Sequence, residues 1–159
     1  MASINGIEIK KLKTFRDHEG IPIAQGEIYY KGKNLGFWSQ DAWGGCDNYG
    51  FDKSVLNQEV EKYKMSNLCE EQFRELTDLD ILLYDLLTII ESEKSYKRGV
   101  KKGYTTFVEI KDFARSGGFY SNVINEKTIK KYSDEWEAKF GRTPTVTVYT
   151  SLNDFNITV

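Results

Sequence analysis

The sequence predicts an α+β fold, built as a single domain over residues 1–159. Short strand patterns cluster in the first third of the chain, one long apolar helical pattern lies in the middle, and a strand, a helix and a strand follow. Strands and helices that are segregated along the chain favour α+β over alternating α/β. The length suits one domain, and no repeat or low-complexity linker divides it. We therefore expect an N-terminal antiparallel β-meander, a central buried helix pair and a C-terminal strand–helix–strand.

Three strands joined by tight turns are predicted in the first third. Apolar residues mark an extended segment over 7–15, and a turn sequence over 16–20 ends in glycine. The chain resumes at 21–30, turns at 31–34 and forms a third strand over 35–38. Connections this short allow only antiparallel neighbours.

An irregular loop and a helix are predicted next. Residues 41–52 fit neither the strand period nor the helix period, and their three glycines favour positive φ angles. Asp52 or Ser54 can cap the helix that follows. The apolar positions of this helix are Val55, Leu56, Val60 and Tyr63.

The central helix has the strongest pattern in the chain. A capping-box pair, Asn67 and Glu70, opens a helical stretch before it. Residues 79–90 then carry so broad an apolar arc that we expect a core helix buried on most sides. It is predicted to run to about Lys97, with Gly99 near its C-terminal cap.

The last third predicts a strand over 105–110, a break at Gly117-Gly118 and an amphipathic helix over 129–140. A β-branched strand follows at 145–150, and residues 157–159 offer a last edge strand.

Composition excludes several classes of protein. Apolar residues make up 40% and aromatic residues 14% of the chain, which argues against disorder, and a net charge of −2 argues against a uniformly basic nucleic-acid-binding protein. Cys46 and Cys69 are too few for a disulfide scaffold and form no zinc motif. No signal peptide or membrane span is predicted, and no metal or other cofactor is expected. A cytoplasmic location with free thiols is the expectation.

The only histidine, His18, limits the catalytic schemes that the chain can support. It lies in an Asp-His-Glu-Gly turn, where His18 and Glu19 could share a proton in a small hydrolase or transferase. Cys46 could act as a nucleophile if His18 came within reach as its base. Turn chemistry explains the same residues without any activity, and we favour that interpretation.

The aromatic, glycine-rich stretch over 36–45, together with the flanking Tyr49 and Phe51, is the strongest candidate for recognition. Trp rings packed over the meander explain it as core, whereas Trp and Tyr beside glycines are also typical anchors of protein interfaces. The candidate partner-binding residues in this stretch are Trp38, Asp41, Trp43 and Tyr49.

Charge is divided along the chain. Residues 57–96 carry a net charge of −6 and residues 97–142 a net charge of +5. An acidic helix surface that includes Glu70 and Glu71 could steer a basic partner toward the protein. The basic segment offers a nucleic-acid contact in which tyrosines stack on bases. Its candidate residues are Tyr96, Lys97, Arg98, Lys101, Lys102 and Tyr104.

The N-terminal third resembles a module found in small proteins of phages and mobile elements. The resemblance covers about residues 7–51. It is carried by Phe15, His18-Glu19-Gly20, Tyr29-Tyr30-Lys31-Gly32-Lys33, Gly36-Phe37, Asp41 and Gly44-Gly45. It implies a genomic neighbourhood in which small proteins bind and inhibit host defence enzymes such as Cas nucleases, and hence the cytoplasm of a bacterial host.

Three functions remain open at this point. We favour a non-enzymatic inhibitor of the anti-CRISPR type that binds a host defence protein. The alternatives are a nucleic-acid-binding accessory or regulatory protein that uses the basic segment over 97–142, and a small hydrolase or transferase centred on His18 and Glu19.

Overall fold

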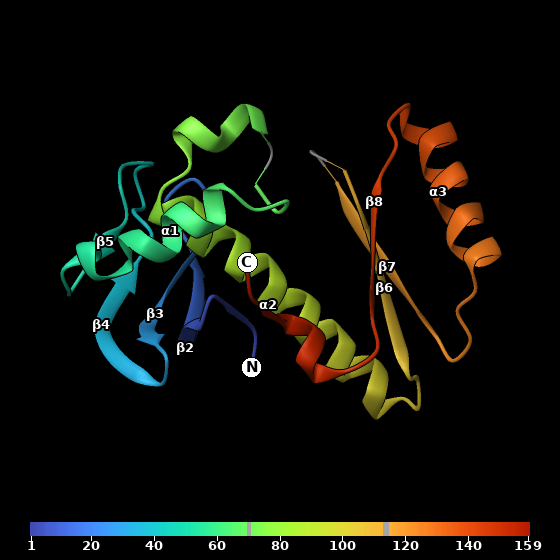
Figure 1. The fold of residues 1–159 in the computed structure, drawn as a ribbon, viewed down its shortest axis with the longest axis horizontal. Coiled ribbons are helices and arrows are strands. Elements are labelled where there is room, and N and C mark those ends of the chain that lie inside the picture. Colours follow the sequence, from blue (N-terminus) through green and yellow to red (C-terminus); the bar gives the residue numbers. More distant parts are fainter. Residues whose placement is uncertain (70, 113–114) are drawn as a thin grey trace. The chain divides into compact units, whose positions relative to one another are not determined.

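The computed structural model describes residues 1–69, 71–112 and 115–159. The chain divides into two compact units. Unit 1 comprises Met1–Ile89 and Asn156–Val159, and unit 2 comprises Ile90–Phe155. Each unit contains helices and a sheet, so the α+β class is confirmed (Figure 1). The single-domain organisation stays a prediction.

Unit 1 is built on a six-stranded mixed sheet with the order β5-β4-β3-β2-β1-β9. Its strands are β1 (Ser3–Ile4), β2 (Ile7–Arg16), β3 (Pro22–Tyr30), β4 (Lys33–Ser39), β5 (Asn48–Tyr49) and β9 (Asn156–Ile157). The expected antiparallel meander is β2-β3-β4. The predicted last edge strand is also present, but it is limited to Asn156–Ile157 and pairs parallel with β1.

A bulge interrupts β2. The register with β3 shifts between Lys10 and Lys13, and Lys11 adopts a φ of 51°. Gly26 lies opposite, where a Cβ atom would come within 2.8 Å of the Lys10 carbonyl oxygen. A bulge changes which face of the sheet the following side chains occupy, and Phe15 beyond it is 45% exposed.

Short helices follow the sheet in unit 1. Asp52 caps the 3₁₀ helix η1 (Lys53–Leu56) by accepting a hydrogen bond from the Ser54 amide, and α1 (Asn57–Lys64) continues from it. Leu56, Val60 and Tyr63 are buried as expected, whereas Val55, on the same 3₁₀ helix as Leu56, is exposed. The predicted second helical stretch is a 3₁₀ helix, η2 (Glu71–Leu76), and the expected cap residue Glu70 lies outside the described residues.

The long helix α2 (Leu79–Lys101) runs past its predicted end. Gly99 is an interior residue of the helix, and a Cβ atom there would lie 2.5 Å from the ring of Tyr120. The glycine therefore allows the helix to approach a strand rather than to end. The left-handed residue after the helix is Gly103, with a φ of 88°.

The buried stripe of α2 is narrower than expected. Leu82, Leu83 and Leu86 are fully buried in unit 1, whereas Ile81 and Tyr84 are exposed. The predicted buried arc included every apolar residue of 79–90. Ile81 and Tyr84 are exposed because they lie on the side of the helix away from those leucines.

Unit 2 contains a three-stranded antiparallel sheet with the order β7-β6-β8. Its strands are β6 (Thr106–Lys111), β7 (Ser116–Ser121) and β8 (Thr145–Tyr149). The predicted break at Gly117-Gly118 is wrong, since β7 continues through both residues. A Cβ atom on Gly118 would lie 2.6 Å from the ring of Phe107, so this position requires glycine for close strand packing.

The helix α3 (Glu126–Phe140) ends where the sequence predicts but begins three residues before its predicted start. Asn125 caps it, and Gly141 follows it with a φ of 70°. A short 3₁₀ helix, η3 (Leu152–Phe155), ends unit 2. Within the described chain, no helix combines the length and apolar character that a membrane crossing requires.

Candidate functional site

Two tryptophans five residues apart have opposite environments. Trp38, near the end of β4, is completely buried, and its Nε1 donates a hydrogen bond of 2.8 Å to Asp47 Oδ2. Trp43, in the loop that follows, is 79% exposed and is the most exposed large apolar side chain among the described residues. Trp38 is therefore a core residue, which corrects its prediction as a contact residue.

The loop that carries Trp43 is held by the carboxylate of Asp41. Asp41 Oδ2 accepts hydrogen bonds from the backbone amides of Trp43, at 3.0 Å, and Gly45, at 2.7 Å. Gly44 between them has a φ of 75°, which glycine adopts without strain. Asp41 therefore fixes the backbone under an exposed indole ring.

The β2–β3 turn is organised by the same chemistry. Asp17 Oδ1 accepts hydrogen bonds from the amides of Glu19, at 2.9 Å, and Ile21, at 2.7 Å. The guanidinium of Arg16 donates a hydrogen bond of 2.5 Å to the Gly20 carbonyl oxygen. This leaves the His18 side chain at the outer end of a closed turn.

His18 joins the turn to the loop. Its ring packs on the Trp43 indole, with the ring centroids 4.0 Å apart and the planes inclined by 31°. We call residues 17–21 and 41–46 together the Trp43 surface. It contains three carboxylates, those of Asp17, Glu19 and Asp41, and no lysine or arginine.

A partly buried polar network anchors the end of the loop. The Asp80 carboxylate, in the first turn of α2, accepts hydrogen bonds from the Asp47 amide at 3.1 Å and from the Tyr49 hydroxyl at 2.5 Å. Burial and the negative charge of Asp80 raise the pKa of Asp47, opposed by the hydrogen bond from Trp38. Burial and Asp80 also raise the pKa of Tyr49 far above its usual value. Tyr49 was predicted to contact a partner, but its half-buried hydroxyl already donates a hydrogen bond to Asp80 within this network.

Of the predicted acidic residues, the structure describes Glu71, which does not join this surface. Glu71 is exposed at the start of η2, and no described contact connects it with residues 41–47. Glu70 is outside the described residues.

The described residues show no contact that supports the catalytic alternative. Cys46 is exposed, and in the described part of the chain no contact joins it to His18, whose Nε2 lies 3.7 Å from a Glu19 carboxylate oxygen. No group of three or more His, Cys, Asp or Glu among the described residues could hold a metal ion. Cys69 is buried, with its sulfur 3.1 Å from Thr77 Oγ1.

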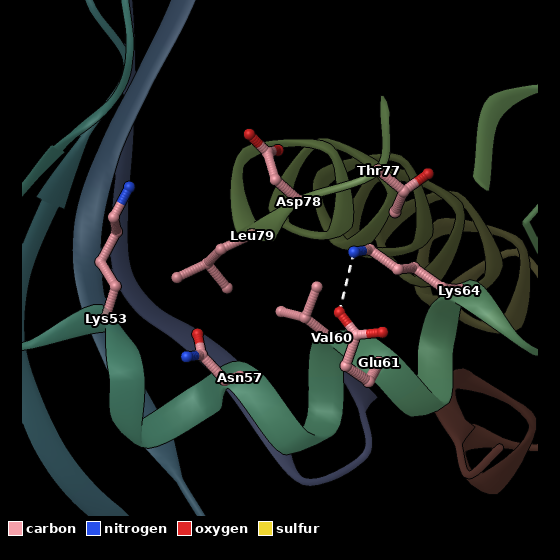
Figure 2. Close-up of a pocket in the computed structure, with 8 residues that line it drawn as sticks. All are labelled: Lys53, Asn57, Val60, Glu61, Lys64, Thr77, Asp78 and Leu79. Carbon is pink, nitrogen blue, oxygen red and sulfur yellow. Dashed lines mark hydrogen bonds and ion pairs between the residues drawn. The ribbon is translucent and has the colours of Figure 1, made fainter. Parts of the chain in front are cut away.

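A polar hollow of about 380 Å³ lies beside α1 and the first turn of α2 (Figure 2). Lys53, Lys64, Glu61 and Asp78 surround an apolar floor that includes Val60. Lys64 Nζ bonds a Glu61 carboxylate oxygen at 2.8 Å. Cations and carboxylates are mixed in this lining, which gives the hollow no single sign of charge.

The tyrosines of the predicted nucleic-acid contact have different roles. Tyr96 is buried, and its hydroxyl donates a hydrogen bond of 2.7 Å to the Thr150 carbonyl oxygen, so it is not available to stack on a base. Tyr104 is 37% exposed and stacks on Tyr120 with a centroid distance of 5.4 Å.

The predicted cations lie on the exposed side of α2 and, for Lys102, in the turn that follows it. Lys97, Arg98, Lys101 and Lys102 are all exposed. Lys97 pairs with Glu93 at 2.7 Å, and Arg98 donates a hydrogen bond to Ser95. A shallow hollow of about 370 Å³ is lined by Glu91, Lys94, Lys97, Arg98 and Lys101. Lys94 was missed, although it lies at helical spacing from the others.

The stacking of His18 on Trp43 was also missed. Consecutive antiparallel strands place the β2–β3 turn and the loop after β4 at the same end of the meander. That topology was the signal that could have brought the two residues together, but their pairing depends on the rotamers of both rings. No family model, curated protein or solved structure matches the chain.

Proposed function

We propose that this chain is a non-enzymatic binding protein that acts by protein–protein contact through the Trp43 surface. The observation that carries the proposal is the 79% exposure of Trp43 on a loop whose backbone is fixed by Asp41. Exposing an indole costs favourable burial, and tryptophan is the residue type that most often dominates protein interfaces.

Preorganisation supports the same proposal. The two turns are closed by side chain–backbone hydrogen bonds, and the His18 ring supports the Trp43 ring. A surface that is already ordered loses less conformational entropy when a partner binds.

The specific partner class rests on the resemblance of residues 7–51. We propose a host defence enzyme, such as a Cas nuclease, that is inhibited when the Trp43 surface binds it. An inhibitor of this kind needs no catalytic groups, because occupation of a functional surface is sufficient.

Capture from a bacterial host lysate, followed by assay of the purified partner, tests this function. We expect Trp43→Ala to weaken capture about 100-fold or more, within the range of hot-spot tryptophans, and to abolish inhibition of the partner. Tyr84→Ala removes another exposed aromatic of unit 1, on α2, and serves as the matched control. Equal capture by the Trp43→Ala and wild-type proteins would contradict the proposal.

A second candidate function is contact with nucleic acid through the basic row of α2. The observation that favours it is the hollow lined by four cations and one carboxylate. The cations from Lys94 to Lys101 extend over two helical turns, about 10 Å, which suits adjacent phosphates of one strand. The residues of the row are Lys94, Lys97, Arg98 and Lys101.

Fluorescence anisotropy with a labelled DNA oligonucleotide tests this candidate. The affinity is expected to fall steeply between about 50 and 200 mM salt, and the double reversal Arg98→Glu/Lys101→Glu is expected to abolish it. Lys130→Glu/Lys131→Glu on α3 gives a control with the same change in net charge. Absence of binding at about 50 mM salt would exclude this function.

A further inference from the structure

We infer that the partner presents a cationic side chain, preferably arginine, to Trp43 and the carboxylates around it. The inference rests on the proposed function and adds the chemistry of the anchoring residue. Charge complementarity between the Trp43 surface and such a side chain carries it.

The Trp43 surface is uniformly acidic. Residues 17–21 and 41–46 contain Asp17, Glu19 and Asp41 without a lysine or arginine. The neighbouring cation, Arg16, is turned to the Gly20 carbonyl oxygen. A cationic partner is attracted to this surface before contact, and a carboxylate would be repelled.

The ring arrangement favours a flat cation. His18 packs on the Trp43 indole, yet the Trp43 side chain remains 79% exposed, so a second planar group has room to stack on it. A cation over an indole is attracted by the electron density of the ring face. A guanidinium can stack on the ring and direct its N–H groups outward at the same time, which an ammonium cannot do.

Acceptors remain available around the ring. The loop amides bond Asp17 through Oδ1 and Asp41 through Oδ2. Within the described residues, the second oxygen of each carboxylate accepts no hydrogen bond. The Glu19 side chain is exposed and lies 3.7 Å from the His18 ring. These oxygens suit the outward-directed N–H groups of an arginine.

The indole N–H signals of the intact protein provide the measurement. The chain has three tryptophans, so Trp43→Phe identifies the Trp43 signal in a ¹H–¹⁵N spectrum. The probe is the blocked peptide acetyl-Gly-Arg-Gly-Arg-Gly-amide. Peptides with lysine or glutamate in place of arginine are the comparisons.

We expect the arginine peptide to shift the Trp43 signal saturably, the lysine peptide to do so more weakly, and the glutamate peptide to leave it unchanged. Glu19→Gln/Asp41→Asn is expected to weaken binding of the arginine peptide at least fivefold. The substituted side-chain amide still offers an oxygen acceptor to the loop amides, while both negative charges are lost. Glu75→Gln, an exposed carboxylate of η2, is the control. Equal shifts with the glutamate peptide, or no effect of the double variant, would overturn the inference.

The captured partner separates this inference from the proposed function. If Trp43→Ala removes capture and Glu19→Gln/Asp41→Asn leaves it intact, the contact is apolar: the inference fails and the proposed function stands. If Trp43→Ala leaves capture intact, both fail. Loss of capture in both variants supports both.

Discussion

The two compact units differ in charge and in how their interiors are built. Unit 1 has 10 basic and 15 acidic residues, a net charge of −5, and unit 2 has 12 basic and 9 acidic residues, a net charge of +3. The overall charge of −2 therefore conceals two electrostatically distinct surfaces. Association with a partner depends on the local field, so each unit requires its own functional hypothesis.

The two units also differ in the side chains that form their interiors. The fully buried side chains of unit 1 are mainly aliphatic residues of the sheet, η1 and α2, together with Trp38 and Tyr63. Unit 2 relies more on paired aromatic rings, such as Tyr149 on Phe155 at 4.3 Å and Phe119 on Tyr132 at 4.1 Å. Unit 1 is therefore expected to be sensitive to lost volume, and unit 2 to altered ring positions.

The largest expected effect is in the core of unit 1. Trp38→Ala should lower the free energy of unfolding by about 3–5 kcal/mol, because it leaves a cavity and removes the indole N–H from Asp47. Denaturant unfolding followed by circular dichroism measures it. Trp38→Phe, which keeps most of the volume, should cost less and remain measurable if the alanine variant does not fold.

Trp43→Ala is the matched control for this prediction. Its side chain is exposed, so the free energy of unfolding should change by no more than about 0.5 kcal/mol. A similar loss for both tryptophans would contradict the division between the core and the Trp43 surface.

Ring position in unit 2 is tested by Gly99→Ala. Alanine favours a helix interior by about 1 kcal/mol, but its Cβ would lie 2.5 Å from the Tyr120 ring. We expect a net loss of roughly 1–3 kcal/mol from overpacking, measured by denaturant unfolding. Adding Tyr120→Ala should cost less than the sum of the single changes.

Val100→Ala, at an exposed neighbouring position of α2, should be nearly neutral. Stabilisation by Gly99→Ala would show that helix propensity outweighs the close packing on Tyr120.

A smaller loss of stability than in the two cores is expected at a buried charge of unit 1. Glu59 is buried and accepts a hydrogen bond of 2.6 Å from the Tyr30 hydroxyl, which, with the charge of Lys62, lowers the pKa of Glu59. A lowered pKa contributes stability that is present above the unfolded pKa and is lost as the pH falls through the folded pKa.

Glu59→Gln keeps an acceptor for Tyr30 and removes the charge. We expect it to cost about 1 kcal/mol at neutral pH and to make the fall in Tm between about pH 5 and 3 shallower. Glu75→Gln, an exposed carboxylate, should leave the wild-type pH profile unchanged. A profile of Glu59→Gln identical to the wild type would show that this carboxylate is not linked to folding.

Local sequence signals predicted much of the fold. The meander followed from turn residues and alternation, and α3 from its apolar spacing and Gly141, while the cap at Asn125 was not predicted. The same signals failed at three glycines that have packing roles. Gly99, Gly117 and Gly118 were expected to end or break an element, but α2 and β7 continue through them. These positions are glycine because neighbouring rings or backbone atoms occupy the space that a side chain would need.

The candidate site was predicted less completely. The stretch with Trp43 and Asp41 was a candidate whose place in the core or at an interface stayed open, and Trp38 and Tyr49 in the same stretch belong to the core and to the anchor at Asp80. Alternation distinguishes the two faces of a strand only while the strand continues, and Trp43 lies beyond the end of β4.

The sequence by itself determined the α+β class, the antiparallel meander and the segregation of charge along the chain, because each depends on neighbouring residues or on simple counts. Only the tertiary structure decided which tryptophan is buried, that the His18 ring packs on Trp43, and that the Tyr96 hydroxyl donates a hydrogen bond to a backbone carbonyl oxygen. These outcomes depend on contacts between residues distant in sequence and on side-chain rotamers, which residue spacing does not encode.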